Sequence, residues 1–163
     1  MGISTQRNCL DRRKLKDMGV QFKLKELTNI EDIQGAYDIY KYCMYMPTKE
    51  KYENKVDYWL HDKNIKVYAC FDSEKIKGII VIWIQNCEEA EVIGISVDIC
   101  ARRQGIGSYM IQQIKAQYNF KVLYAETDDD AVLFYEKNGF EITEVIKEYD
   151  GQRVTRYLCQ LKD

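Results

Sequence analysis

The chain has 163 residues, of which 46% are hydrophobic and 31% charged, and its formal net charge is −2. This length and composition describe one globular domain with a core of its own. The charge balance argues against nucleic acid as a main partner, and no apolar run approaches the roughly 20 residues of a membrane span. Because the N-terminus lacks the apolar core of a signal peptide, we expect a cytoplasmic protein without a membrane partner.

The first 17 residues differ from the rest of the chain. They combine a basic excess with few apolar side chains; the charged residues are Arg7, Asp11, Arg12, Arg13, Lys14, Lys16 and Asp17. A segment with so little to bury fits a short helix or a disordered arm. We therefore expect a basic N-terminal extension over residues 1–17 and a single domain over residues 18–163.

The elements expected from residue 21 onward alternate regularly. A strand over 21–27 is followed by a helix that Asn29 can cap and that runs to about residue 45, and Pro47 separates it from a second helix over 49–62. Three strands over 66–71, 76–85 and 90–97 come next. A loop and helix over 104–118, a strand over 122–127 and a short helix from Ala131 follow. A hairpin over 140–149 and 154–161 turns at Asp150-Gly151.

The cysteines predict no metal site. Six of them are scattered along the chain without a C-x-x-C pair, and His61 is the only histidine. No zinc-ligand spacing fits this set, so we expect reduced thiols, several of them small core residues.

The segment from Val92 to Ile111 is the most informative in the chain. A β-branched run leads into a glycine-bearing loop, and apolar residues then recur at helical spacing. Such a strand-to-helix junction presents unpaired backbone N–H groups and the positive end of a helix dipole, which together suit a phosphate. Taken alone, the glycines Gly105 and Gly107 also fit a tight turn without a ligand.

A second motif follows at the expected distance. Residues 128–140 read DDDAVLFYEKNGF, a short helix with acidic residues at its start and Gly139 as a left-handed C-cap. The loop matches R/Q-x-x-G-x-G/A and this helix matches A-x-x-F-Y-E-K-x-G-F. With both motifs in this order, the chain resembles the GNAT N-acetyltransferase superfamily over about residues 20–162.

The resemblance implies a mixed α/β fold of the GNAT acyl-CoA N-acyltransferase type. Its sheet is mostly antiparallel and flanked by helices, with one parallel strand pair around the CoA cleft. The parallel pair must be joined by a crossover, and a ligand is expected at the C-terminal ends of its strands.

The resemblance also implies acetyl-CoA as cosubstrate. The loop would hold the pyrophosphate, and the strand around Ser96 would splay from its neighbour, pair with the pantetheine and meet the oxyanion with its N–H groups. Asp128 stands where many members have an asparagine, and it lacks the amide donor. The expected cofactor-binding residues are Ile95, Ser96, Val97, Arg102, Arg103, Gln104, Gly105, Ile106, Gly107, Ser108 and Asp128.

Two residues are the catalytic candidates. In the family, the tyrosine at the Tyr135 position lies beside the CoA sulfur, and a phenol of pKa about 10 can protonate a thiolate of pKa about 8.5. The alternative for Tyr135 is a plain core aromatic. Glu91 lies where the histone-acetyltransferase branch has its base glutamate, although an acidic cluster at a strand start also fits a solvated turn. Glu126 is the reserve base, and bulk water is a third option.

The expected activity is transfer of an acetyl group to a primary amine by direct attack in a ternary complex. The acidic residues Glu88, Glu89 and Glu91 favour a small cationic amine over a lysine or a protein N-terminus. The first helix is crowded with tyrosines that line a pocket or pack in the core: Tyr37, Tyr40, Tyr42 and Tyr45. The alternatives are a GNAT-fold acyl-CoA-binding module without catalysis and, last, a nucleotide-binding domain. A homodimer is compatible with the sequence.

Overall fold

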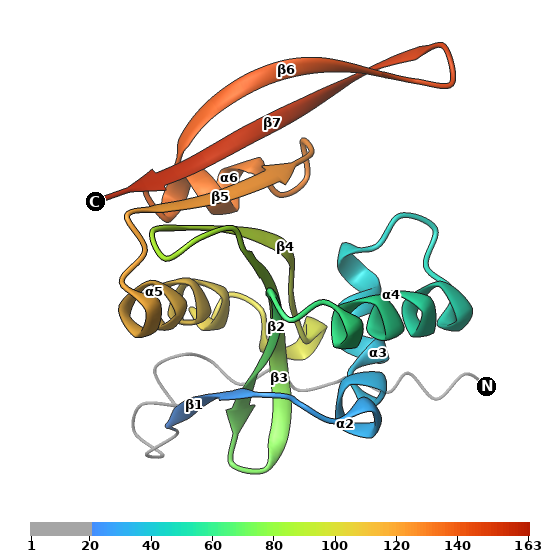
Figure 1. Ribbon diagram of the computed structural model, residues 1–163, viewed down its shortest axis with the longest axis vertical. Coiled ribbons are helices and arrows are strands. Elements are labelled where there is room, and N and C mark those ends of the chain that lie inside the picture. The colour runs from blue at the N-terminus through green and yellow to red at the C-terminus, as the bar shows by residue number, and fades with distance from the viewer. Residues whose placement is uncertain (1–20) are drawn as a thin grey trace, which may run out of the picture.

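The computed structural model describes residues 21–163. Seven strands form one sheet in the order β1-β2-β3-β4-β5-β7-β6, and every neighbouring pair is antiparallel except β4 and β5 (Figure 1). The mixed sheet expected from the sequence is therefore confirmed. The strands are β1 (Phe22–Glu26), β2 (Ile65–Asp72), β3 (Lys75–Ile84), β4 (Glu89–Val97), β5 (Val122–Thr127), β6 (Glu141–Tyr149) and β7 (Gln152–Lys162). The extension expected over 1–17, and its boundary with the domain, lie outside the described residues.

Helices cover both faces of the central strands. Figure 1 shows α5 on one side of these strands and α3 and α4 on the other. The α-helices are α2 (Ile30–Gly35), α3 (Tyr37–Tyr40), α4 (Lys49–His61), α5 (Ile106–Tyr118) and α6 (Val132–Lys137), with 3₁₀ turns η1 (Lys41–Cys43) and η2 (Ile99–Ala101). Residues 79–82 of β3 are all fully buried, because a strand covered on both faces has no solvent side. No helix within residues 21–163 has the length and apolar character needed to cross a membrane.

Each face of the sheet has its own core. The periodic apolar residues of α5, Ile106, Met110 and Ile114, pack with alternate residues of the sheet such as Val92 and Leu123. On the opposite face, buried side chains of α2 and α4 (Ile33, Tyr52, Val56 and Trp59) pack with the other alternate set of sheet residues, which includes Ile79 and Val81 of β3. The period of 3.6 in the helices and of 2 in the strands thus brings the two apolar sets together.

The strands β4 and β5 are paired over only part of their length. The parallel ladder runs from Glu89↔Val122 to Val92↔Ala125. Beyond it β4 continues to Val97 along β3, while β5 continues to Thr127 along β7. A bulge in β4 coincides with the end of the ladder, since Val92 pairs with Ile82 and Gly94 with Val81. The two strands therefore diverge toward their C-terminal ends.

The helix expected from residue 29 to about residue 45 is wrong as a single element. Asn29 caps α2 as expected, but α2 ends at Gly35, and Ala36 leaves helical geometry with φ −87° and ψ 5° before α3 and η1 follow. This break lets Tyr40 reach the sheet, where a Cβ on Gly94 would lie 2.0 Å from the Tyr40 hydroxyl oxygen. Gly35, with its low helix propensity, is the local reason for the break.

Candidate active site

The loop between β4 and α5 is built to present backbone N–H groups. Asp98 accepts a hydrogen bond from the Cys100 N–H at 3.1 Å and so forms η2. Arg103 and Gly105 then adopt left-handed conformations with φ of 63° and 83°, and α5 begins directly after Gly105. Left-handed residues in such a turn gather neighbouring N–H groups into an anion-binding concavity, to which the first turn of a 13-residue helix adds its dipole.

The second glycine of the loop is needed for close packing. A Cβ on Gly107 would lie 2.7 Å from Cε2 of Phe134, the residue before Tyr135 in α6. The backbone of α5 at Gly107 therefore packs directly against the Phe134 ring of α6, the helix that carries Tyr135.

The side chain of Arg102 extends from this loop toward Val97 and Tyr42. Its Nε donates to the Val97 carbonyl at 3.3 Å, and its guanidinium lies 5.1 Å from the ring centre of Tyr42. The first residue of the loop motif thus joins the end of β4 to the η1 segment.

Tyr135 follows Phe134 in α6, and its hydroxyl makes no hydrogen bond to the described part of the protein. The residue is 4% exposed, and its ring packs edge-on against Phe134 and Phe140 at 5.2 and 5.1 Å. Within residues 21–163 this hydroxyl has no hydrogen-bond partner. Since every fully buried polar side-chain atom of the described residues has a partner, the Tyr135 hydroxyl must be in contact with solvent. Burial raises its pKa above the usual value, with smaller contributions from charges that include Glu91. The phenol therefore keeps its proton at neutral pH. Gly139 ends α6 with φ 85°, as the sequence predicted.

Cys43 is a neighbour of Tyr135 that the sequence did not single out. It is exposed at the end of η1, and its thiol donates to the Tyr40 carbonyl at 3.2 Å. Burial raises the pKa of the thiol to about 11, against the opposing effects of Tyr40 and of the Ile95 backbone. The thiol also contributes to the raised pKa of Tyr135, so the two side chains lie near one another.

Glu91 lies on the face of the sheet opposite α5. It lines a cavity of about 280 Å³ together with Gln85, Tyr124, Glu126, Leu158 and Gln160. Burial raises the pKa of Glu91, the charge of Glu126 raises it further, and Lys147 partly offsets both. A carboxylate with a raised pKa is suited to accept a proton near neutral pH.

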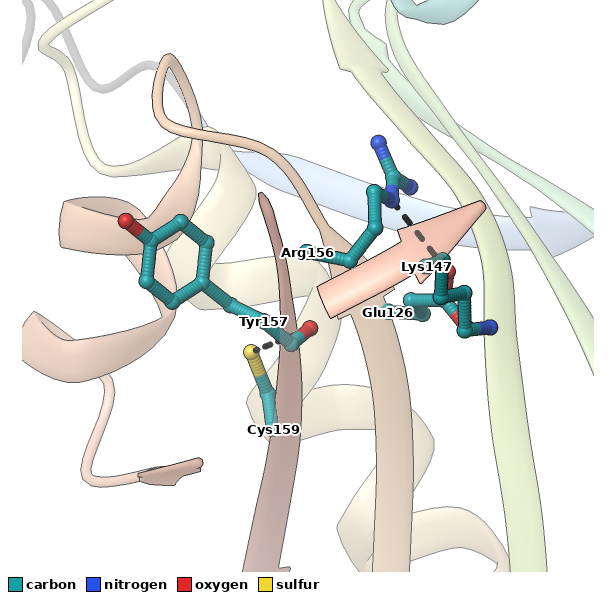
Figure 2. Close-up of polar contacts among 5 residues, drawn as sticks. All are labelled: Glu126, Lys147, Arg156, Tyr157 and Cys159. Atoms are coloured by element: carbon teal, nitrogen blue, oxygen red, sulfur yellow. Dashed lines mark hydrogen bonds and ion pairs between the residues drawn. The ribbon is translucent and has the colours of Figure 1, made fainter. Parts of the chain in front are cut away.

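Glu126 has the opposite character. It accepts hydrogen bonds from Lys147 Nζ at 2.5 Å and from Arg156 Nε at 3.2 Å, one on each oxygen (Figure 2). Burial acts to raise the pKa of Glu126, but these two cations outweigh it and lower the pKa. A carboxylate that is held ionised on both oxygens is a weak base, so Glu91 is the better candidate of the pair.

The other acidic candidates have partners of their own. Glu88 is paired with Lys121, and Glu89 accepts from Asn86 at 3.0 Å and from the Tyr124 hydroxyl at 3.3 Å. The side chain of Asp128 accepts from the Asp130 N–H at 3.1 Å and so shapes the turn after β5.

Several further candidates serve packing. Ile95 and Val97 point into the α5 core, and the buried Ser96 donates to the Ile39 carbonyl at 2.6 Å. Of the four tyrosines of the first helical region, Tyr40 is buried, whereas Tyr42 and Tyr45 are exposed. No cluster of three or more metal-binding side chains is present in the described part of the chain.

Comparisons with known proteins agree with this geometry. An acetyltransferase (GNAT) domain model matches residues 63–142, which include β4, the loop, α5 and α6. No curated protein sequence matches the chain.

Solved structures share the fold at low identity. An acetyl-CoA-bound GNAT acetyltransferase from Elizabethkingia anophelis is 21% identical, with TM-score 0.64 over 86% of this chain and 97% of its own. The ribosomal-protein-S18-alanine N-acetyltransferase of Escherichia coli is 17% identical, with TM-score 0.68 over 87% and 94%. A mutant of the Vibrio cholerae spermidine N-acetyltransferase is 15% identical, with the same score and shares. The chain therefore carries an acetyltransferase (GNAT) domain over residues 63–142, and GNAT acetyltransferases use acetyl-CoA as cosubstrate.

Proposed function

We propose that the protein transfers an acetyl group from acetyl-CoA to the primary amine of a small cationic acceptor, by direct attack in a ternary complex. The observation that carries this proposal is that Tyr135, whose hydroxyl has no partner within residues 21–163, lies close enough to Glu91 for that charge to raise its pKa, near the end of the β4–β5 ladder. Tyr135 can donate a proton to the leaving group and Glu91 can accept one from the acceptor amine.

The cofactor site is assigned to the loop and to the free end of β4. The backbone N–H groups of residues 103–108 bind the pyrophosphate of acetyl-CoA, because left-handed turns and the start of α5 gather donors there. The stretch Ile95–Val97, past the last β5 pair, offers backbone groups to the pantetheine and the thioester carbonyl.

The chemical step follows from these placements. Glu91, directly or through water, takes a proton from the acceptor ammonium, and the free amine attacks the thioester carbonyl to form the new C–N bond. Backbone N–H groups of β4 stabilise the oxyanion. When the C–S bond breaks, Tyr135 gives its proton to the departing thiolate, and the second proton of the amine leaves the new amide nitrogen through water and restores the Tyr135 hydroxyl.

The size of the acceptor site favours a small molecule. The cavity at Glu91 has a volume of about 280 Å³, and both Glu88 and Glu89 are engaged by neighbours, so Glu91 remains the carboxylate that can meet an ammonium group. Two of the three named neighbours act on an alanine of a ribosomal protein and on spermidine, so this fold accommodates both kinds of amine.

The test is thiol release from acetyl-CoA in the presence of an amine panel, with the wild type and Tyr135→Phe. The variant keeps the ring packing and loses the proton donor, so kcat should fall about 10²- to 10⁴-fold while acetyl-CoA affinity is unchanged. Tyr118→Phe, which removes a hydroxyl bonded to Tyr68 near the C-terminal end of α5, is the matched control and should retain activity.

Two results would contradict the proposal. Acetyl-CoA binding without turnover on any amine would indicate a binding module. A loss below about threefold in Tyr135→Phe, with chemistry rate-limiting, would leave Tyr135 as a core aromatic.

A further inference from the structure

Arg156 shares an uncovered face of the sheet with the candidate base. Residues alternate between faces along a strand, so Arg156 and Leu158 of β7 lie on the face of Glu126 and Glu91, opposite the buried Ala125. The side chain of Arg156 is 26% exposed and returns along the sheet to Glu126. It therefore reaches Glu126, which lines the cavity at Glu91, from the hairpin side, while Arg156 itself lies just outside the lining of that cavity.

Most of the hydrogen-bonding capacity of Arg156 is unused. Its Nε is bound to Glu126, but the two terminal nitrogens, which carry four N–H donors, have no partner within residues 21–163. Figure 2 shows the Nε of Arg156 turned toward Glu126. A guanidinium held by Nε and free at its fork is pre-oriented to bind a second anion.

The four local charges sum to zero but are separated across the cavity. Lys147 and Arg156 together carry two positive charges, and Glu126 supplies one negative charge to both. One positive charge is therefore left on the hairpin side of the cavity, while Glu91 places a negative charge on the β4 side. A polyamine would satisfy Glu91 but would bring a second cation toward Arg156.

We propose that the acceptor is an amino acid, or an amine with a carboxylate a few bonds away, whose carboxylate binds the terminal nitrogens of Arg156 while its amine lies at Glu91. This inference rests on the proposed function: it keeps the ammonium group at Glu91 and replaces the purely cationic acceptor with a zwitterion. The paired N–H groups of a guanidinium match the two oxygens of a carboxylate. Glu91 is level with Tyr124, and Glu126 lies two residues further along β5, about 7 Å of strand, which an α- or β-amino acid with its hydrogen bonds spans.

Matched acceptor pairs that differ only by a carboxylate provide the test. Phenylalanine is compared with phenethylamine, and lysine with cadaverine, by thiol release from acetyl-CoA. The wild type should prefer the amino acid of each pair. Arg156→Gln should raise KM for the amino acid about 10- to 100-fold, the strength of a hydrogen bond to a charged group, and leave KM for the plain amine unchanged.

Lys147→Gln is the control. It removes the other cation from Glu126 and leaves the fork of Arg156 in place, so the preference for the amino acid should persist. Equal loss of preference in both variants would mean that Arg156 acts only through Glu126, and would overturn the inference.

Failure of the inference is distinguishable from failure of the proposed function. Turnover of the plain amines with no preference for the amino acids would refute the carboxylate site alone. If no amine is turned over, the catalytic proposal fails, and calorimetry of phenylalanine and phenethylamine with the CoA-saturated protein decides the carboxylate site: tighter binding of phenylalanine that Arg156→Gln abolishes would support it, and equal binding would refute it.

Discussion

Gly107→Ala sets two opposing effects against each other. Alanine favours a helix over glycine by about 0.5–1 kcal/mol, and Gly107 does not have a positive φ, so the backbone alone predicts stabilisation. The new Cβ would, however, lie 2.7 and 3.1 Å from two ring carbons of Phe134. Ordinary carbon–carbon contacts are about 3.5–4.0 Å long, so the ring must move by about 1 Å, and overpacking of this kind costs about 1–3 kcal/mol.

In the wild-type background the steric cost at Phe134 should exceed the gain in helix propensity. The net loss is up to about 2 kcal/mol, or a fall in Tm of up to about 8 °C for a domain of this size. In a Phe134→Leu background the ring is gone, so the same substitution should raise Tm through helix propensity alone. Thermal unfolding of the four proteins measures the cycle, and the sign reversal is the expected result. If Gly107→Ala raised Tm in both backgrounds, the close approach of α5 to α6 would have no energetic role.

The remaining predictions concern the anion site and the base. Ser108→Glu should preserve or raise Tm, because a carboxylate in the first turn of α5 interacts favourably with the helix dipole. The same charge should repel the pyrophosphate and weaken acetyl-CoA binding about 10- to 100-fold. Calorimetry compares this variant with Ser108→Gln, and equal affinities would contradict the assignment of the pyrophosphate to this loop. The raised pKa of Glu91 predicts that wild-type kcat/KM falls as pH drops through that pKa, and that Glu91→Gln lacks this limb. An ionised Glu91 disfavours folding, so Glu91→Gln should also raise Tm at pH 7, and this difference should vanish near pH 4, where the carboxyl is protonated in both states. Unchanged pH profiles of rate and Tm would indicate an ordinary surface carboxylate.

Local chemistry made much of the fold predictable. The apolar periods placed the strands and helices from residue 49 onward within a few residues, and Gly139 and Gly105 have the left-handed conformations that a C-cap and a tight loop require. The Tyr135 helix and the strand of Glu91 were likewise identified from local sequence.

The rest depended on contacts between distant segments. The break after Gly35 has a local signal, but its extent reflects the packing of Tyr40 on Gly94, which no periodicity contains. Arg156 joins Glu126 through the register of β5 and β7, thirty residues apart in sequence. A charge in a hairpin gives no hint of such a partner, so the sequence singled out Glu91 and Glu126 but not the cations Lys147 and Arg156 that contact Glu126.

The short ladder between β4 and β5 has a mechanical consequence. Backbone pairing joins β1–β4 to β5–β7 over four residue pairs, whereas β6 and β7 are paired over nine (Figure 1). The sheet therefore has the fewest backbone pairs along the line between β4 and β5, where we place the thioester. Fluctuations that pull the two halves apart should begin at that line, and a cosubstrate seated there bridges both halves. The α5 core still joins the two halves, so the empty enzyme should fluctuate most at this line, and the occupied enzyme should fluctuate less there.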